Sequence, residues 1–313
     1  MTHRLNLFLL ALLVMIGAPV YWLLLDTSPR DVPPARLDLA ELRQLANAMP
    51  GPKAVAVHLE LAAWRRLPGD LLAAGSGLKR RMIGVISFQL PVPGRGPVVI
   101  DSGISRALGQ AWGAEKFDPL AQARIDAQMR QASLILITHE HPDHIGGLAA
   151  LATREDGVLD HAKLNPAQVR GSDALHWPRA VSPMLDGLHP QAAAPGVVVI
   201  PAPGHSPGSQ LIFVQLASGA EYLFTGDIAS MAANWREQRP RSRVLTDYVL
   251  PEDRRAVLGW LRAIDGLHKA APGLFVIASH DFDWLTDPLN RPGVTRLGSP
   301  APTSSPLTKP TGT

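Results

Sequence analysis

The sequence of 313 residues contains no cysteine. Disulfides, thiolate nucleophiles and cysteine-type metal sites are therefore excluded, and any metal must be held by histidine and carboxylate. Charged residues are also sparse, at 18%, and the net charge of +3 is a mild basic bias that predicts no nucleic-acid partner. The hydrophobic content of 46% is enough for one large domain or two small ones.

A long run without formal charge lies near the amino terminus, at residues 5–25. At about 1.5 Å per residue, a helix of this length spans roughly 30 Å, the hydrocarbon thickness of a bilayer. We interpret residues 1–25 as a signal-anchor, that is, a transmembrane helix. A cleaved signal peptide, with a small-residue site near Gly17 and Ala18, and a buried core helix are the alternatives. An anchor or an export signal places the rest of the chain outside the cytoplasm, in a periplasmic or other extracytoplasmic space.

Three further segments follow along the chain. Residues 26–53 form a proline-containing linker, interrupted by a short amphipathic helix with Leu39, Leu42, Leu45 and Met49 on one face. Residues 54–289 are expected to form a globular domain. Residues 290–313 are rich in Pro, Ser, Thr and Gly and are expected to be a disordered tail.

Within the globular region, β-rich runs fall into two groups with helical patterns between them. Helices are expected at 118–132 and 251–268. Strands are expected at 54–61, 82–90, 97–101, 133–138, 196–202, 209–216, 221–226 and 274–279. This order predicts two sheets packed face to face with helices outside them.

Four of these strands end in side chains that are typical metal ligands, and loops at strand ends are where a rigid scaffold presents functional groups. The strand at 133–138 leads into a loop with three histidines and an aspartate, and three later strands each lead to one more such residue. The side chains concerned are His139, His141, Asp143, His144, His205, Asp227 and His280.

The spacing within the first loop has a physical consequence. His139 and His141 are two residues apart, so in an extended segment they project to the same side. Pro142 prevents the strand from continuing, so Asp143 and His144 can face a second centre. Imidazole and carboxylate ligands without sulfur suit zinc, and they also tolerate iron, manganese or cobalt.

The segment "THEHPDHIGG" at 138–147 resembles the signature of the metallo-β-lactamase-fold superfamily, and "PGHSPGS", "FTGD" and "SHD" resemble its later motifs in the same order. The resemblance covers residues 54–289. It implies an α+β fold, a four-layer αββα sandwich with the site at one edge of the two sheets. "IDSG" at 100–103 resembles the family's Asp-Ser/Thr-Gly turn, which makes Asp101 a supporting residue and no ligand.

The same resemblance implies a ligand set for two Zn²⁺ ions. His139, His141 and His205 would bind one metal, Asp143, His144 and His280 the other, and Asp227 would bridge them. A metal-bridging hydroxide would then attack a carbonyl or phosphoryl centre. The resemblance also implies that Asp143 orients the nucleophile and moves its proton, which makes it the catalytic candidate.

The substrate is less well defined. Asp227 argues against the serine-containing subclass of β-lactamases, in which this bridging carboxylate is absent. The lack of cysteine excludes the β-lactamase subclass that has a cysteine ligand. Glyoxalase II-like enzymes share a bridging aspartate but have a helical carboxyl-terminal extension. Here only residues 281–313 follow His280, and most of them are expected to be disordered. Acyl-homoserine lactonases carry a tyrosine soon after this aspartate, and here none occurs until Tyr248. The glyoxalase II and lactonase-like branch still fits best.

The first hypothesis is therefore a dinuclear zinc hydrolase of a small ester, lactone or thioester, with a small-molecule substrate and the membrane as its partners. A phosphodiesterase, nuclease or β-lactamase of the same fold is the alternative. An iron persulfide dioxygenase would leave several of the seven side chains without a role. A non-catalytic binding module belongs to a different class, and a complete ligand set argues against it.

Two segments have open roles. Residues 235–243, "WREQRPRSR", are either a solvated loop or an anion-recognition loop over the site. Residues 61–81 link two strands and form either an ordinary long hairpin insertion, a lip over the metals or a membrane-surface patch.

Overall fold

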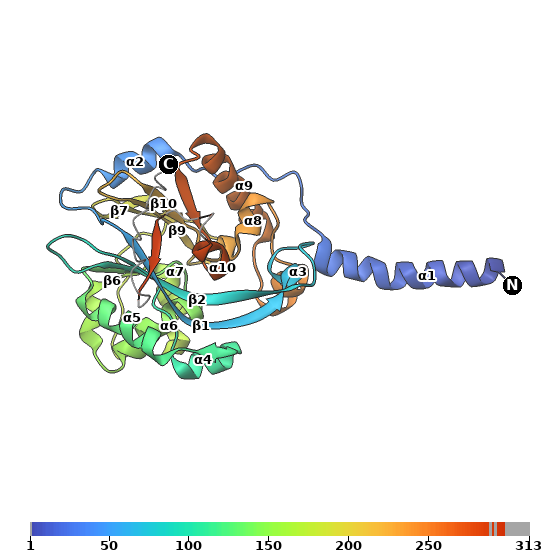
Figure 1. Cartoon of the computed structure of the whole chain (residues 1–313), viewed down its shortest axis with the longest axis horizontal. Coiled ribbons are helices and arrows are strands. Elements are labelled where there is room, and N and C mark those ends of the chain that lie inside the picture. Colours follow the sequence, from blue (N-terminus) through green and yellow to red (C-terminus); the bar gives the residue numbers. More distant parts are fainter. Residues whose placement is uncertain (1, 288–289, 291–292, 298–313) are drawn as a thin grey trace, which may run out of the picture.

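Two β-sheets packed face to face form the centre of the computed structural model, which describes residues 2–287, 290 and 293–297 (Figure 1). The first sheet has the strand order β12-β1-β2-β3-β5-β6, and β4 pairs with β1. Its strands are β1 (Val57–Pro68), β2 (Arg80–Leu90), β3 (Val98–Ile100), β4 (Lys116–Phe117), β5 (Leu134–Leu136), β6 (Ala162–Lys163) and β12 (Val294–Arg296). Parallel and antiparallel pairs both occur, so the sheet is mixed.

The second sheet has the order β11-β10-β9-β8-β7 and is also mixed, because β10 and β11 run parallel while the other neighbours are antiparallel. Its strands are β7 (Gln191–Ala194), β8 (Val197–Pro201), β9 (Gln210–Gln215), β10 (Glu221–Phe224) and β11 (Leu274–Ile277). The two groups of strands predicted from the sequence thus form two separate sheets.

Apolar residues face both sides of these strands, because each sheet is covered on both faces. In β3, Val98 and Ile100 point into the core between the sheets, whereas Val99 points outward to the helices. In β8, Val199 faces the inner core and Val198 faces the outer one. Successive side chains of a strand point to opposite faces of the sheet, so short and continuously hydrophobic strands contribute to all three apolar layers. These are the core between the sheets and the two cores between a sheet and its helices.

Helices cover the two outer faces, which completes the predicted αββα sandwich. The first sheet is covered by α4 (Arg106–Trp112), α5 (Pro119–Gln131) and α6 (Pro142–Ala152), and the second by α2 (Leu39–Ala46) and α9 (Arg254–Ala270). The short helices are α3 (Gly69–Leu72), η2 (Asp156–His161), α7 (Pro166–Gly171), η3 (Asp173–Leu175), η4 (Gly226–Ala229), α8 (Ala232–Arg236), η5 (Val244–Val249) and α10 (Phe282–Thr286).

Side-chain caps set the ends of the two long helices. The carboxylate of Asp118 accepts hydrogen bonds from the backbone N–H groups of Leu120 and Ala121, so α5 begins where the sequence predicted. The helix expected from residue 251 begins at Arg254 instead. Asp253 is its cap, since its carboxylate accepts from the N–H of Ala256.

The expected linker and tail both differ from the prediction in part. The short helix in the linker is present as α2, and it is packed on the domain, with Leu42 and Ala46 buried. In the segment expected to be disordered, β12 pairs in parallel with the start of β1, and Val294 is buried in the inner core. Backbone hydrogen bonds and one apolar side chain therefore order this segment despite its polar composition. Residues 291–292 and 298–313 of that tail lie outside the described residues.

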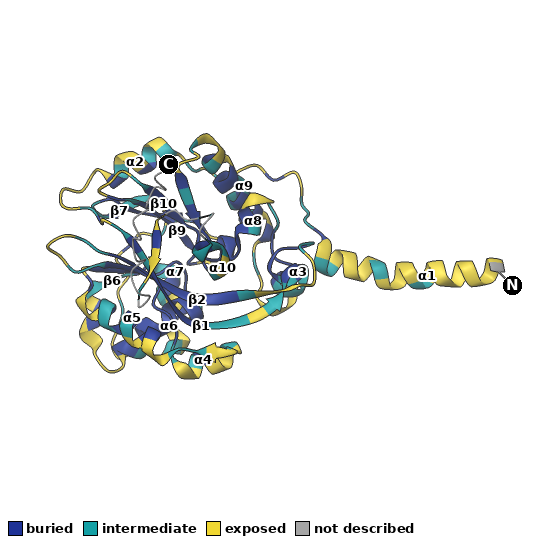
Figure 2. Ribbon diagram, in the orientation of Figure 1, coloured by how far each residue is buried: buried dark blue, intermediate teal, exposed yellow. Residues whose placement is uncertain are grey.

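The amino-terminal apolar run forms α1 (Thr2–Val20) and continues as one π-helical turn, η1 (Tyr21–Leu25). The span His3–Leu25 has 23 residues and a mean hydropathy of 2.4, and none of it is buried inside the protein. Figure 2 shows this helix exposed along its length and standing away from the domain. The buried-core-helix alternative is therefore wrong, and an export signal or a membrane anchor remains.

The 61–81 segment is a long hairpin. β1 continues to Pro68 and β2 begins at Arg80, so residues 61–68 and 80–81 extend the first sheet, and the turn at 69–79, which contains α3, lies beyond it. The hairpin reaches from the sheets towards the inner end of α1 (Figure 1).

Candidate metal centre

The structure brings all seven predicted side chains together where the strands of both sheets end. His139, His141, Asp143 and His144 come from the β5–α6 connection, and each of the other three comes from a different loop of the second half. These are His205, after β8; Asp227, in η4 after β10; and His280, after β11. Six are buried, and His141 is half-buried. A rigid scaffold thus holds seven potential ligand groups in one place.

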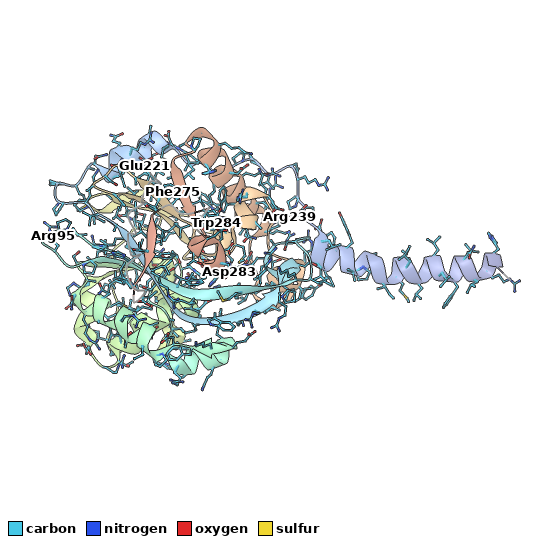
Figure 3. All side chains as sticks on the ribbon, viewed as in Figure 1. Arg95, Glu221, Arg239, Phe275, Asp283 and Trp284 are labelled. Atoms are coloured by element: carbon cyan, nitrogen blue, oxygen red, sulfur yellow. The ribbon has the colours of Figure 1, made fainter. Side chains whose placement is uncertain are left out.

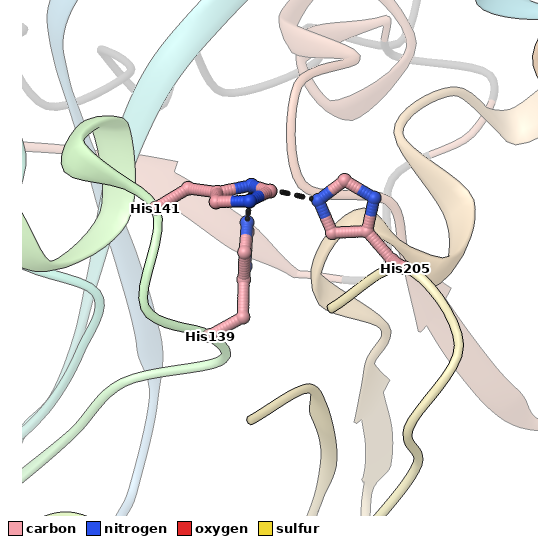
Figure 4. A group of neighbouring side chains, drawn as sticks. All are labelled: His139, His141 and His205. Atoms are coloured by element: carbon pink, nitrogen blue, oxygen red, sulfur yellow. Dashed lines mark hydrogen bonds between the residues drawn. The ribbon is translucent and has the colours of Figure 1, made fainter. Parts of the chain in front are cut away.

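Three histidines form the first group of this site. His141 Nδ1 lies 3.0 Å from His139 Nε2 and 2.9 Å from His205 Nε2. Figure 4 shows the three rings converging through these nitrogen atoms. Three imidazole nitrogens that point at one another from two loops leave one corner open, which is the donor set of a tetrahedral metal site.

The second group contains Asp143, His144 and His280. His280 Nε2 lies 3.4 Å from His144 Nε2 and 3.6 Å from Asp143 Oδ2. Asp227 lies between the two groups. Its Oδ1 is 2.9 Å from His280 Nε2 and its Oδ2 is 3.6 Å from His205 Nε2, so each carboxylate oxygen faces a different group.

The outer nitrogen of several imidazoles is already bonded to an acceptor, which tests whether the site fits metal ions. His144 Nδ1 bonds to Asp101 Oδ2 at 2.9 Å, and His205 Nδ1 bonds to Glu252 Oε1 at 2.7 Å. His280 Nδ1–H donates to the carbonyl oxygen of Gly84 at 2.6 Å. These bonds fix the tautomers and leave the Nε2 lone pairs facing inward, the arrangement of histidines that bind metal.

Two carboxylates support the loops without pointing into the centre. Asp101 has φ = 59°, and it accepts from the N–H of Thr138 at 2.7 Å as well as bonding to His144. Glu140 accepts from Ser206 Oγ at 2.9 Å and from the N–H of Gly208 at 3.1 Å, which ties the histidine loop to the His205 loop. The strained turn at Asp101 is thus compensated by several hydrogen bonds.

Arg241 is a buried cation at the site that the sequence did not single out. Its Nη2 donates to Asp227 Oδ2 at 2.5 Å, and its Nη1 donates to Glu252 Oε1 at 2.7 Å. Its place in an arginine-rich segment was the only sequence signal. Glu252 had none, because it precedes the cap of α9 and lies far from His205 along the chain. Neither expectation for the 235–243 loop covers this role, in which Arg241 fixes a carboxylate of the site and Trp235 is buried in the core.

The electrostatic environment prepares the site for cations. Burial, together with the charge of neighbouring histidines, lowers the pKa of His139 well below its usual value, and the pKa of His141 to about 4. For Asp227, burial opposes ionisation, but His280 and Arg241 hold its pKa well below the usual range. His144 is the exception: burial is outweighed by Asp101 and Asp143, which raise its pKa to about 9, so a metal ion that binds its Nε2 has to displace a proton.

A cavity of about 190 Å³ opens directly above this centre. Its walls include Leu72 and Ile83 of the β1–β2 hairpin, and Leu245 and Leu250 of the segment that contains η5. The hairpin therefore forms a lip over the site, which supports one of the roles considered for it. Arg65 also lines the cavity and stacks on the ring of Trp112, with Cζ 4.1 Å from the ring centroid.

A larger cavity of about 540 Å³ lies beside the site, lined by residues that include Asp283 and Trp284, which are labelled in Figure 3. None of the seven clustered side chains lines it. We therefore assign the chemistry to the smaller cavity, because a reactive site needs its functional groups in contact with the ligand.

An αββα sandwich with histidines and aspartates gathered at one edge defines a class of metal-binding hydrolase folds. Residues 90–286 match the family described as the Metallo-beta-lactamase superfamily. The chain belongs to this superfamily, and its His/Asp cluster has the residue set of a metal-dependent hydrolase.

Individual relatives are more distant. A hydroxyacylglutathione hydrolase of Albidiferax ferrireducens is 34% identical over 97 residues, which cover 31% of this chain and 34% of that protein. The match thus spans about a third of the relative's length. A solved N-acyl homoserine lactone hydrolase, with the product N-hexanoyl-L-homoserine at its catalytic metal center, has a TM-score of 0.56 at 16% identity. That match covers 74% of this chain and 95% of the other.

A probable metal-dependent hydrolase from Staphylococcus aureus has a TM-score of 0.53 at 14% identity, with 74% of this chain and 91% of the other covered. At such identities, the two solved structures support the fold and leave the substrate open.

Proposed function

We propose that the protein is a dinuclear, zinc-dependent hydrolase that cleaves a small ester, lactone or thioester. In this assignment His139, His141 and His205 hold one ion, Asp143, His144 and His280 hold the other, and Asp227 bridges the two. Iron, manganese or cobalt would suit the same donors. The observation that carries the proposal is the position of Asp227, whose two oxygens face the two groups of histidines.

The residues divide the work of hydrolysis as follows. When bound, the two ions supply an activated water and a Lewis acid for the carbonyl oxygen. The pKa of Asp143 is lowered, since His144 and His280 outweigh its burial, so its Oδ2 stays ionised and can orient that water as a hydrogen-bond acceptor. Arg241 keeps Asp227 ionised and in position. The apolar lip excludes bulk water from the cavity.

Three observations favour a hydrolase of an ester, lactone or thioester over the alternatives. Arg241 is bonded to Asp227 and Glu252, and Arg243 is bonded to Asp26, so neither is available for a phosphodiester. Two of the relatives named above are, by name, a hydroxyacylglutathione hydrolase and an N-acyl homoserine lactone hydrolase. Asp143 and Asp227 would both have a role, whereas a single-iron dioxygenase would need fewer side chains.

We also propose that α1 remains attached as a membrane anchor and that the domain lies outside the cytoplasm. Its exposed apolar surface has no partner among the described residues of the domain, and its length suits a bilayer. Sequencing the amino terminus of membrane-fraction protein tests this. An intact residue 1–25 segment supports the anchor, and a terminus near residue 18 in a soluble fraction contradicts it.

A substrate panel tests the activity. Purified protein with zinc should hydrolyse p-nitrophenyl acetate, a γ-lactone or an acyl thioester faster than bis-p-nitrophenyl phosphate and nitrocefin, and a chelator should abolish the activity. Faster hydrolysis of the phosphodiester, or activity that survives chelation, would contradict the proposal. A Trp235→Phe variant is a suitable control, since this buried ring does not line the cavity.

A further inference from the structure

The inner end of the apolar helix is fixed to the domain by several bonds. The carbonyl oxygen of Leu24 accepts a hydrogen bond from the N–H of Gly75, at 3.1 Å, in the turn of the hairpin. The guanidinium of Arg243 lies over the ring of Trp22, with Cζ 3.9 Å from the ring centroid. Asp26, which is buried, accepts from Arg243 Nε at 2.8 Å. The helix therefore leaves the domain at a defined place.

The same two elements line the cavity above the metal centre. In the hairpin, Leu72 lies in the cavity wall shortly before Gly75, which contacts the helix. η5 follows Arg243 directly and contributes Leu245 and Val249 to the opposite wall. Figure 1 shows the hairpin and α3 beside the inner end of α1. The mouth of the cavity therefore lies next to the base of the helix.

Large apolar side chains are exposed on both of these elements, the turn of the hairpin and the segment that contains η5. The apolar rim, as we call it, consists of Leu78, Tyr248, Val249 and Leu250, whose exposed fractions are 72%, 74%, 59% and 43%. Exposed apolar clusters usually mark an interaction surface. Lys79 follows Leu78 and is exposed as well, and a basic residue of this kind favours the headgroups of anionic lipids.

We propose that the apolar rim lies in the interface of the bilayer that α1 spans, and that the cavity takes its substrate from that bilayer. The substrate class is then an amphiphile, an ester or lactone with a long acyl chain. The acyl chain of the substrate would lie along Leu245, Val249 and Leu250, and its carbonyl group would reach the metal centre. Water is added across the acyl C–O bond, which yields a carboxylic acid and an alcohol. This inference rests on the proposed hydrolytic function and on α1 remaining attached.

A lipid-quenching experiment tests the position of the rim without using activity. Because the chain has no cysteine, Leu78→Cys, Tyr248→Cys and Leu188→Cys each create one site for an environment-sensitive dye. Leu188 is 75% exposed, as much as the rim residues, and it lies shortly before β7, a strand that Figure 1 shows at the end of the molecule far from α1. It is therefore a matched control.

The labelled full-length chains are reconstituted into phosphatidylcholine vesicles with brominated acyl chains. Quenching of the dyes at positions 78 and 248, and not at 188, is the expected result. Equal quenching at all three positions would overturn the inference, as would no quenching at the rim. If the dyes at the rim are shielded from water only at high protein concentration, the rim is a contact between copies of the chain. That result also overturns the inference.

A chain-length series tests the substrate class. In vesicles, the full-length protein should hydrolyse the dodecanoyl ester of p-nitrophenol faster than the hexanoyl and acetyl esters. Replacing Leu78 and Tyr248 together by Asp should reduce dodecanoyl hydrolysis about tenfold, because two apolar contacts with lipid are lost. Acetyl ester hydrolysis should stay unchanged. The control pair Met184→Asp with Leu188→Asp, also exposed, should affect neither ester.

The two proposals fail in different ways. If the wild-type protein with zinc hydrolyses no ester, the proposed function fails, whereas the quenching result still decides where the rim lies. If the acetyl ester is hydrolysed but the rim and control pairs lose dodecanoyl activity equally, the hydrolase stands and the membrane route is overturned.

Discussion

The amino-terminal half of the domain presents four of the seven clustered side chains from one loop, whereas the carboxyl-terminal half presents three from three loops. In the first half, the spacing from His139 to His144 and the start of α6 at Pro142 place the groups. In the second half, the order of β8, β10 and β11 in the sheet brings the loops together. That half also contains the buried pair Arg241 and Glu252, which holds Asp227 and His205.

The comparison shows that local spacing places the ligands of the first half, with hydrogen bonds from Asp101 and Glu140, while the ligands collected from distant loops also need a buried ion pair. A buried cation and carboxylate are stable only as a pair, since either one alone would be an uncompensated charge. The second half is therefore the more sensitive to substitution, and the following variants test that difference.

The largest effect is expected for Asp227→Ala. This change removes the group that faces both sets of histidines and leaves Arg241 buried without its partner. Activity should fall by more than the roughly 10–100-fold loss that is typical of residues that only support ligands. Metal analysis and ester hydrolysis measure the result. Asp265→Asn changes a different buried aspartate, which lies on α9. It is the control and should retain both metals. Full activity in the Asp227 variant would refute the bridging role.

The supporting carboxylates of the two halves can be compared directly. Glu252→Ala frees His205 Nδ1 and also leaves Arg241 short of a partner, whereas Asp101→Asn keeps one oxygen, which can accept from either the N–H of Thr138 or His144 Nδ1. We expect a loss of zinc affinity of about 10–100-fold for Glu252→Ala and a smaller one for Asp101→Asn. Competition with a chromogenic chelator measures both. A greater loss for Asp101→Asn would reverse the comparison between the halves.

The first half depends on close backbone packing. A Cβ at Gly147 in α6 would lie 1.9 Å from the carbonyl oxygen of Ser102, whereas one at Gly146 would meet only the flexible end of Leu108, at 2.7 Å. Gly147→Ala should lower the free energy of unfolding by about 1–2 kcal/mol, despite the better helix propensity of alanine. Gly146→Ala should be close to neutral. Urea unfolding distinguishes them, and equal effects would show that the helix has room to shift.

The smallest effect concerns α2, outside both halves of the site. Arg43 Nε donates to Glu221 Oε1 at 2.8 Å, and this bond holds the pKa of Glu221 below its usual 4.5. Arg43 is half exposed, so Arg43→Ala should cost about 1 kcal/mol or less at pH 7. Because the pKa in the folded state is lowered, this contribution is present above pH 4.5 and is lost as the pH falls and Glu221 is protonated. Thermal unfolding at several pH values should show the difference shrinking in acid, and a constant difference would contradict it.

Much of the site could be predicted because its side chains follow strands that the sequence marks clearly. The histidine loop is evident from its own spacing, and His205, Asp227 and His280 are evident as polar ends of apolar runs. The network of Arg241 and Glu252 could not be predicted, since partners in a buried pair are set by packing between elements and leave no periodic pattern. The β12 strand escaped prediction for a related reason, because its partner in the sheet is β1, at the other end of the domain.

The central claim is that seven side chains from the two halves hold two metal ions. Metal analysis of the purified full-length protein, by inductively coupled plasma mass spectrometry with the Asp227→Ala variant measured in parallel, tests it most directly. We expect two zinc ions per wild-type chain and fewer in the variant. A single iron per chain in the wild type, or two tightly bound ions in the variant, would contradict it.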